Sequence, residues 1–476
     1  MLREQAVASL APIEKPLRRV GGRFADAGWE IALVGGPVRD ALVGRLSFET
    51  DLDFTTNAQP EQIVDLLEGW AEAVWDVGIR FGTVGARIDG REVEITTYRS
   101  ESYDAESRKP EVAFGNNLAD DLARRDFTMN AMAVTLPSME FVDLFDGIVD
   151  LAARLIRTPG TAQSSFDDDP LRMMRAARFA SQLDATVDAD VVDARSAEAE
   201  RISIVSAERV REEFSKIVMS DHPRVGLTLL VDTGIADIVL PELPLLRLEA
   251  DEHHHHKDVY EHTLTVLEQA ITLESVHEPT CEPDLTLRLA ALLHDIGKPK
   301  TRKFEDEGRV SFHHHEVVGA RMTKKRMREL RFPNDLTDDV AKLVELHLRF
   351  HGYGTGEWTD SAVRRYVRDA GDQLVRLHKL TRADSTTRNR KRAQALQSAY
   401  NDLEQRIERL SEEEELAAMR PDLDGAKIME VLGIPPGPLV GEAYNFLLGL
   451  RLDRGPLDEE QAVEALRAWW AARESG

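Results

Sequence analysis

The sequence predicts an α+β fold whose strands lie in the part of the chain before Asp150. Residues 31–34 form a short apolar run, and residues 51–54 and 93–96 alternate polar and apolar side chains, which is typical of strands. Helical periodicity lies between these segments, for example at 60–73, and dominates everything after Asp150. A chain of 476 residues is long enough for about three domains.

The composition indicates a protein without disulfides or membrane spans. Cys281 is the only cysteine, so neither a disulfide nor a thiolate metal site can form within the chain, which fits a reducing cytoplasm. No apolar run has the length of a membrane span, and the first residues lack a signal-peptide core. We therefore expect a cytoplasmic protein with no membrane partner.

The overall charge argues against a nucleic-acid partner. The net charge is −25, whereas proteins that neutralise phosphates are usually basic. Basic residues nevertheless gather in three short segments, 124–125, 324–328 and 388–392. Each segment is either part of a nucleic-acid interface or a solvated helix face.

A glycine turn follows the first predicted strand. Gly35 and Gly36 would let the backbone approach a ligand closely, and the helix that starts there would favour an anion at its N-terminus. Arg39 could add a positive charge for a phosphate. A plain strand–helix turn is the alternative.

Acidic residues line one face of two predicted strands. Asp51 and Asp53 are two residues apart, so both carboxylates would point to the same side, and Glu94 lies on a later strand. Carboxylate oxygens suit Mg²⁺, which keeps waters and substrate phosphates as its other ligands. Two such ions can stabilise the attacking and leaving oxygens of an in-line displacement. An Asp-x-Asp pair can be a mere solvated strand edge, but its place between the glycine turn and Glu94 favours a catalytic magnesium site.

These motifs resemble, in order, the signature of the polymerase-β nucleotidyltransferase superfamily. The nearest branch is the class II tRNA nucleotidyltransferases (CCA-adding enzymes) together with the bacterial poly(A) polymerases. The family implies a nucleotidyltransferase head with a mixed catalytic sheet, followed by a helical neck, body and tail. The motifs that carry the resemblance are Gly35-Gly-Pro-Val-Arg-Asp40, Asp51-Leu-Asp53, Phe81-Gly-Thr-Val84, Glu94-Ile-Thr-Thr97, Arg124-Arg-Asp-Phe-Thr-Met-Asn130, Asp168-Asp-Pro-Leu-Arg-Met-Met-Arg-Ala-Ala-Arg-Phe179 and Ala207-Glu-Arg-Val-Arg-Glu-Glu-Phe214.

Asp169 and Arg172 are candidates for choosing the base. They stand three residues apart on a predicted helix and would be neighbours on its surface. They could form an ordinary surface ion pair, or they could together bind the edge of the nucleotide base. The carboxylate could accept from the amino group of cytosine or adenine, and the guanidinium could donate to the adjacent ring nitrogen. Guanine and uracil present the opposite pattern and would be rejected. In the family this motif selects the base, with Asp168 here in place of a glutamate.

Three further arginines match family positions. Arg125 matches a position that contacts the nucleotide in the family, although it could be an RNA-facing surface arginine. Arg175 and Arg178 follow Arg172 in steps of three residues. On an α-helix, each such step falls about 60° short of a full turn, so the side chains shift progressively around the helix. Arg178 should thus point away from Asp169, so a phosphate contact or an ion pair in the neck suits it better than base reading.

A second constellation lies in the helical half of the chain. His294 and Asp295 are adjacent at the end of an apolar helical run, and such a pair can bind one metal ion together. His262 lies upstream on another predicted helix, and Asp384 lies downstream. Nitrogen and oxygen ligands of this mix suit several divalent metals, so the metal stays open.

This ordered set resembles an HD domain, a helical superfamily of metal-dependent phosphohydrolases. The resemblance implies hydrolysis of phosphate esters by a metal-activated water, with a structural remnant as the alternative. His315 is a further candidate ligand, but His313 and His314 directly precede it, so the sequence does not decide which of the three histidines binds the metal. His347 is another, four residues before His351 and hence on the same predicted helix face.

The motifs and resemblances divide the chain into four predicted parts. We expect a catalytic head at 1–157, a neck with nucleotide-base and RNA-binding motifs at 158–250, an HD-like metal-binding domain at 251–400 and a helical tail at 401–476. The resemblance implies a template-independent enzyme that adds C, C and A to the 3′ end of tRNA from CTP and ATP, with release of pyrophosphate. It also implies Mg²⁺ in the head and a second divalent metal of open identity in the HD domain.

Other functions are weighed against this one. A poly(A) polymerase, or an enzyme that adds only A or only CC, belongs to the same class. Residues 458–476 lack the basic extension that such poly(A) polymerases often carry, so we expect CCA addition. A metal-dependent phosphohydrolase with an RNA-binding scaffold, or a non-catalytic RNA-binding protein, would leave the intact Asp51, Asp53, Asp169 and Arg172 unexplained.

Overall fold

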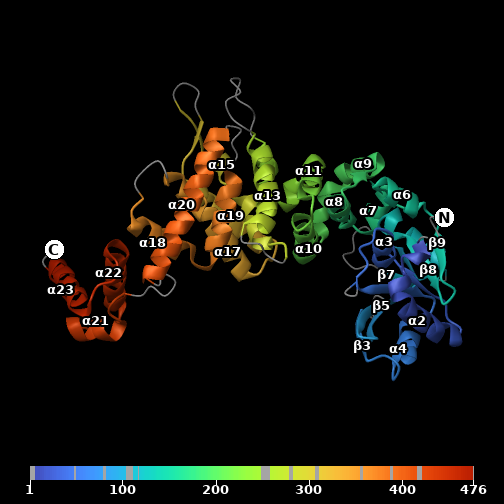
Figure 1. Ribbon diagram of the computed structural model, residues 1–476. Coiled ribbons are helices and arrows are strands. Elements are labelled where there is room, and N and C mark those ends of the chain that lie inside the picture. Colours follow the sequence, from blue (N-terminus) through green and yellow to red (C-terminus); the bar gives the residue numbers. More distant parts are fainter. Residues whose placement is uncertain are drawn as a thin grey trace. The chain divides into compact units, whose positions relative to one another are not determined.

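The structure is a computed structural model that describes residues 6–47, 50–78, 82–102, 111–115, 117–247, 258–277, 282–305, 310–353, 358–385, 390–414 and 421–474. The chain divides into two compact units, Met1–Pro244 and Leu245–Gly476 (Figure 1). Phe81, Cys281 and Arg388, which were named above, lie outside the described residues.

Unit 1 contains a seven-stranded mixed sheet in the strand order β3-β4-β5-β2-β1-β8-β9. β2 and β5 pair in parallel, whereas β1 pairs antiparallel with both β2 and β8. This arrangement confirms the mixed sheet that the N-terminal part of the sequence predicts. Its strands are β1 (Ile31–Val34), β2 (Leu52–Thr56), β3 (Ala73–Gly78), β4 (Thr83–Ile88), β5 (Arg91–Thr97), β8 (Met132–Leu136) and β9 (Glu140–Asp143).

The other elements of unit 1 are mostly helices. The α-helices are α2 (Glu14–Asp26), α3 (Gly36–Leu42), α4 (Pro60–Leu67), α5 (Leu118–Ala123), α6 (Gly147–Ala153), α7 (Ala162–Asp168), α8 (Arg172–Leu183), α9 (Ala189–Glu198), α10 (Ala207–Val218), α11 (Pro223–Asp232) and α12 (Ile235–Val239). Two short strand pairs accompany them, β6 (Arg99–Ser102) with β7 (Glu111–Phe114) and β10 (Leu155–Ile156) with β11 (Thr186–Val187).

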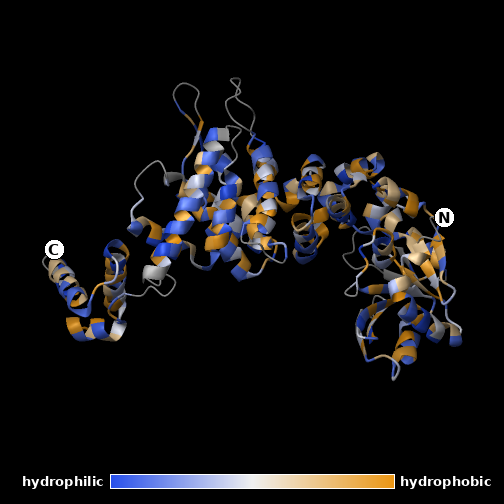
Figure 2. Ribbon diagram, viewed as in Figure 1, coloured by the Kyte–Doolittle hydropathy of each residue, from blue (hydrophilic) through white to orange (hydrophobic). Residues whose placement is uncertain are grey.

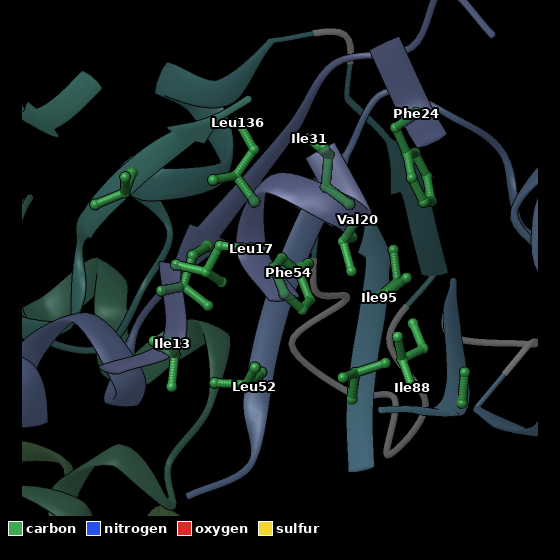
Figure 3. Close-up of a cluster of buried hydrophobic side chains, with 14 of the residues drawn as sticks. Ile13, Leu17, Val20, Phe24, Ile31, Leu52, Phe54, Ile88, Ile95 and Leu136 are labelled. Carbon is green, nitrogen blue, oxygen red and sulfur yellow. The ribbon is translucent and has the colours of Figure 1, made fainter. Parts of the chain in front are cut away.

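The hydrophobic core of the head fills one face of the sheet. Alternation along β2 buries Phe54 on this face, and the same alternation along β5 buries Ile95. Figure 3 shows both side chains in one cluster with Val20 and Phe24 of α2. Helix α4 joins the cluster through Ile63. Because one face is apolar, the polar residues of β2 and β5 are left for the opposite face.

Close packing joins the helices that follow the head. Helix α8 packs against α10 and α11. At this contact a Cβ on Gly226 would lie 2.2 Å from Ser181 Oγ, so only glycine lets α11 approach α8 this closely. The N–H of Gly226 donates to Ser181 Oγ at 2.9 Å, which ties the two helices together.

Among its described residues, unit 2 is helical apart from one short hairpin, β12 (Arg302–Phe304) with β13 (Val310–Phe312). Helix α14 is buried along almost its whole length, because α13, α17 and α19 pack around it. In Figure 2, α20 is by contrast largely hydrophilic. The helices are α13 (Val259–Val276), α14 (Leu285–Leu293), α15 (Lys298–Thr301), α16 (His315–Glu329), α17 (Asn334–Leu346), α18 (Asp360–Ala370), α19 (Leu374–Asp384), α20 (Arg390–Glu414), α21 (Gly425–Leu432), α22 (Pro438–Arg454) and α23 (Glu459–Glu474).

Two details differ from the sequence-based expectation. The helix expected at 60–73 ends at Leu67, and Ala73 already begins β3, because Gly69 adopts a positive φ of 69° that an α-helix does not accommodate. After Asp150 helices dominate the described residues, as expected, but the sequence did not indicate the short strand pairs β10–β11 and β12–β13. Within the described residues, no helix is long and apolar enough to cross a membrane.

Candidate active site and metal centre

Three carboxylates gather on the polar face of the head sheet. Asp53 and Glu94 are direct partners in the register of the parallel strands β2 and β5, so their side chains leave the sheet on the same side. Asp51 directly precedes β2 and is exposed. Burial, with smaller contributions from the charges of Glu94 and Asp51, raises the pKa of Asp53 to about 6 against the opposing charge of Arg125. This acidic face therefore has the donor set and the clustered negative charge that suit a divalent cation.

The glycine turn brings Arg125 next to the acidic face. Gly35 has φ 73° and ψ −129°, a conformation that L-residues rarely adopt. A Cβ on Gly35 would lie 3.0 Å from Arg125 Nη1, so the glycine also makes room for this guanidinium. Gly36 begins α3 directly behind the turn, as expected. Arg125 Nη2 donates to Asp121 Oδ2 at 3.2 Å, which keeps the side chain in place.

A chain of polar contacts connects the head to α8. Arg39 Nη1 donates to Asn130 Oδ1 at 2.7 Å, and Asn130 Nδ2 donates to Asp126 Oδ1 at 2.9 Å. Asp126 Oδ2 lies 2.7 Å from Arg175 Nη2. Burial opposes the ionised form of Asp126, but Arg175 and Asn130 outweigh it and hold the pKa of this carboxyl below its ordinary value. The sequence alone does not assign a role to Asp126 or Asn130, because their partners Arg175 and Arg39 are distant in the chain.

Asp169 and Arg172 do not share one helix, which corrects the sequence-based expectation. Asp169 follows α7 in an extended conformation with φ −145° and ψ 103°, and Arg172 is the first residue of α8. Pro170 explains the break, because a residue before proline is driven out of the helical region. Asp169 Oδ1 accepts from the N–H of Leu171 at 3.1 Å, and Oδ2 accepts from Arg209 Nη2 at 2.9 Å. The carboxylate is therefore oriented from two sides.

The guanidinium of Arg172 is held by groups outside its own helix. Nη1 donates to Ser165 Oγ at 2.9 Å, and Nη2 donates to the backbone carbonyl of Arg124 at 2.6 Å. Arg178 lies further along α8 and forms a buried ion pair with Glu213 of α10, with Nε 3.2 Å from Oε2. Burial lowers the pKa of Arg178 to about 10, and Glu213 opposes that shift. An ion pair in the neck was one of the two outcomes that the helical rotation suggested for Arg178.

In unit 2, six side chains from five segments of the chain converge on one centre. The ligand atoms of the first group lie within 4.8 Å of one another, as do those of the second. Asp384 Oδ1 lies 2.9 Å from His262 Nε2, and Asp295 Oδ2 lies 3.2 Å from His294 Nε2. The first group is His262, His294 and Asp384, the second is Asp295, His315 and His347, and the six residues are called the HD centre below.

The histidines of the HD centre are oriented like metal ligands. Nδ1 of His294, His315 and His347 lies 2.8, 2.8 and 2.6 Å from the backbone carbonyl three residues before it. A neutral imidazole that donates through Nδ1 keeps the lone pair of Nε2 for a metal. These three Nε2 atoms are buried and find no hydrogen-bond partner among the described residues. Such unsatisfied inward nitrogens fit a bound cation, and six ligands in two groups are enough for two ions.

The structure resolves the histidine register that the sequence left open. His315 is buried in the centre, whereas the side chains of His313 and His314 are 69% and 83% exposed. His314 has a φ of 59°, and this left-handed residue turns the chain into α16. The expectation that His347 and His351 share a helix face is wrong, because α17 ends at Leu346 and a 3₁₀-helix begins at Arg349.

The electrostatics of the HD centre are strongly coupled. Burial opposes the charged form of His294, but without a bound cation Asp295 and Asp384 outweigh it and raise the pKa of His294 to about 10. A metal ion that binds Nε2 would have to displace this proton. Burial, together with the charge of His294, lowers the pKa of His347 to about 3. Lys298 Nζ lies 2.6 Å from Asp295 Oδ2. Lys298 stands three residues after Asp295 at the start of α15, and this spacing is the local signal that could have indicated the contact.

Comparison with protein families agrees with this geometry. Residues 31–157 match a model of the poly A polymerase head domain, and residues 259–389 match the HD domain. Residues 185–246 match a model described as "Probable RNA and SrmB- binding site of polymerase A".

Individual relatives point to the same group. An A-adding tRNA nucleotidyltransferase of Deinococcus radiodurans is 32% identical over 452 residues, which cover 94% of this chain and 96% of that enzyme. A CCA-adding enzyme of Lactobacillus helveticus is 42% identical over 215 residues, which cover 45% of this chain and 52% of that enzyme. The crystal structure of the Bacillus stearothermophilus CCA-adding enzyme in complex with CTP shares the fold, with a TM-score of 0.67 at 23% identity over 100% of this chain and 99% of that chain. The chain belongs to the family of tRNA nucleotidyltransferases, which are enzymes.

Proposed function

We propose that this enzyme adds C, C and A to the 3′ end of tRNA, using CTP and ATP and releasing pyrophosphate. The observation that carries the proposal is the acidic face of β2 and β5 in the same unit as the oriented residues Asp169 and Arg172. The relatives support it, since the full-length match is a tRNA nucleotidyltransferase and a structure of the same fold contains CTP.

Asp51, Asp53 and Glu94 would hold Mg²⁺, because this ion prefers oxygen ligands and leaves positions for substrate phosphates. When bound, it would stabilise the charge that develops on the attacking and leaving oxygens. The 3′-hydroxyl of tRNA attacks the α-phosphorus, and the bond to pyrophosphate breaks. Arg125 stands beside both Gly35 and Asp53, which is where its charge can orient the phosphates.

Base selection would rest on Asp169 and Arg172. The carboxylate accepts from the exocyclic amine of cytosine or adenine, and the guanidinium donates to the neighbouring ring nitrogen. Because both side chains are held by other protein groups, their positions are set before the nucleotide binds. Uracil and guanine would leave these groups unsatisfied, and that penalty makes rejection strong.

A-only addition is a second candidate for the head. The relative that matches over its whole length is named an A-adding enzyme, whereas the CCA-adding enzyme of Lactobacillus helveticus matches over 52% of its length. The two activities differ in the use of CTP. The test is to supply tRNA without its CCA end, and tRNA ending in CC, and to sequence the products. C incorporation into the first substrate supports CCA addition, and A incorporation into the second substrate alone supports A-only addition.

A second activity is proposed for unit 2, the metal-dependent hydrolysis of phosphate esters. The specific observation is the set of buried inward Nε2 atoms of His294, His315 and His347. The six residues of the HD centre would hold one or two divalent ions, which when bound would activate water. Lys298 is close enough to Asp295 to bind a phosphate oxygen beside the centre.

A further inference from the structure

Ser165 lies in the middle of α7, one helical turn before Asp169. Its side chain belongs to the buried set, with the residue 7% exposed. Its backbone carbonyl accepts the N–H of Asp169 at 3.2 Å. Its hydroxyl accepts from Arg172 Nη1 at 2.9 Å. One serine therefore contacts both members of the pair to which base selection is assigned.

The second anchor of Arg172 comes from the head. Nη2 donates to the carbonyl of Arg124 at 2.6 Å, while Nη1 is held by Ser165 Oγ and lies 3.4 Å from the Ser165 carbonyl. A guanidinium is planar and its donors form a fixed fork, so two acceptors at its two ends define its plane. A long arginine side chain has many rotamers in the absence of such anchors.

We propose that Ser165 is a positioning residue for nucleotide selection, and that its hydroxyl fixes the plane of the Arg172 guanidinium at a set distance from Asp169. This inference rests on the proposed function of the pair. Ser165 touches no substrate in this role. It acts by keeping the donors of Arg172 where a cytosine or adenine ring nitrogen would meet them, and a small misplacement of such a donor lowers the advantage of the correct base.

The hydroxyl can be removed with little other change. Alanine keeps the backbone carbonyl that accepts from Asp169, and it favours a helix more than serine does. Ser165→Ala should therefore leave α7 and Asp169 in place. It should remove the 2.9 Å hydrogen bond of Arg172 Nη1 and leave that nitrogen only its longer 3.4 Å contact with the backbone carbonyl of residue 165. Ser164→Ala is the matched control, because Ser164 is the exposed neighbour in the same helix.

The experiment measures kcat/KM for CTP, ATP, UTP and GTP on tRNA lacking its CCA end. Ser165→Ala should lower the preference for CTP over UTP by about tenfold, the size of one hydrogen bond to a charged group, while Ser164→Ala keeps it. In an Arg172→Ala background, Ser165→Ala should change the preference no further, because the two residues act through one contact. Thermal unfolding of each variant accompanies the assay.

The outcomes separate this inference from the proposed function. A wild-type enzyme without any preference for CTP and ATP would overturn both. A selective wild type with an equally selective Ser165→Ala variant would overturn the positioning role alone. The same holds if Ser165→Ala slows all four nucleotides equally and lowers the unfolding temperature, since that result describes a structural residue. Additive effects of Ser165→Ala and Arg172→Ala would also contradict it.

Discussion

The acidic face of the head and the HD centre of unit 2 are both built for cations, but in opposite ways. The acidic face offers only carboxylates, and two of its members, Asp51 and Glu94, are exposed. The HD centre combines carboxylates with imidazoles, and all of its residues except His262 and Asp384 are fully buried. Oxygen ligands on an open strand face leave most of the coordination shell to water and substrate.

The difference lies in what completes each site. Backbone carbonyls orient the imidazoles of His294, His315 and His347 through their Nδ1 atoms, so the protein itself sets most of this ligand set. Asp51 and Glu94 of the acidic face are exposed instead, and we expect the nucleotide phosphates to complete this site. We therefore expect the head to hold its metal only weakly without substrate, and the HD centre to keep its metal through purification.

The largest expected effect is on the head. Asp53→Ala should lower nucleotide incorporation about a thousandfold or more, because several kcal/mol of charge stabilisation would be lost. tRNA binding should stay within a factor of about three, since one carboxylate on the catalytic face contributes little to phosphate contacts. Primer extension and filter binding measure the two quantities. Asp65→Ala is the control, because Asp65 is an exposed aspartate of α4, the helix on the opposite side of the sheet. Retained incorporation in Asp53→Ala would remove the acidic face from the mechanism.

The next effect concerns the HD centre. His294→Ala should lose the bound divalent metal and lower hydrolysis of a model phosphodiester about a hundredfold, because the water is no longer activated. Nucleotide incorporation should stay within about twofold of wild type, if the two centres differ as described. Elemental analysis and both activity assays check this, with the exposed His313→Ala as control. Loss of incorporation together with the metal would show that the two centres depend on each other.

A smaller effect follows from the pKa of Asp53, which burial raises to about 6. Below that pH the carboxyl is protonated and cannot bind a cation, so at low Mg²⁺ incorporation should fall about tenfold per pH unit as the pH drops below 6. Higher Mg²⁺ competes with the proton and should move this acid limb to lower pH. The raised pKa also means that the metal-free fold loses stability as the pH rises from about 4 to 6, and Asp53→Asn should abolish that loss. An acid limb that Mg²⁺ does not move would contradict the assignment.

Short-range patterns predicted much of the molecule. The two-residue period of strands predicted that Asp53 and Phe54 lie on opposite faces of the sheet. The glycine turn after β1 also lies where the sequence predicts it. The helical unit 2 and the convergence of His262, His294 and Asp384 also followed the predicted order. The domain boundaries at 157, 250 and 400 and the cytoplasmic location stay predictions.

Two of the features that the sequence did not indicate depend on contacts across the fold. The role of Ser165 depends on its contact with Arg172. This contact forms because α8 starts at Arg172 and the guanidinium of that residue points back to α7. Arg209 reaches Asp169 across 40 residues of sequence. The break at Pro170 was a local signal and could have been used, because proline restricts the residue before it. The assignment of each site residue to its chemical role stays a prediction.

The most direct measurement of the central claim is the sequence of the products formed on tRNA that lacks its CCA end. The substrate is incubated with CTP alone, with ATP alone and with both. We expect two added cytidines with CTP alone, almost no addition with ATP alone, and a single CCA end with both, after which addition stops. Long adenosine tails with ATP alone, or no use of CTP at all, would contradict CCA addition by this enzyme.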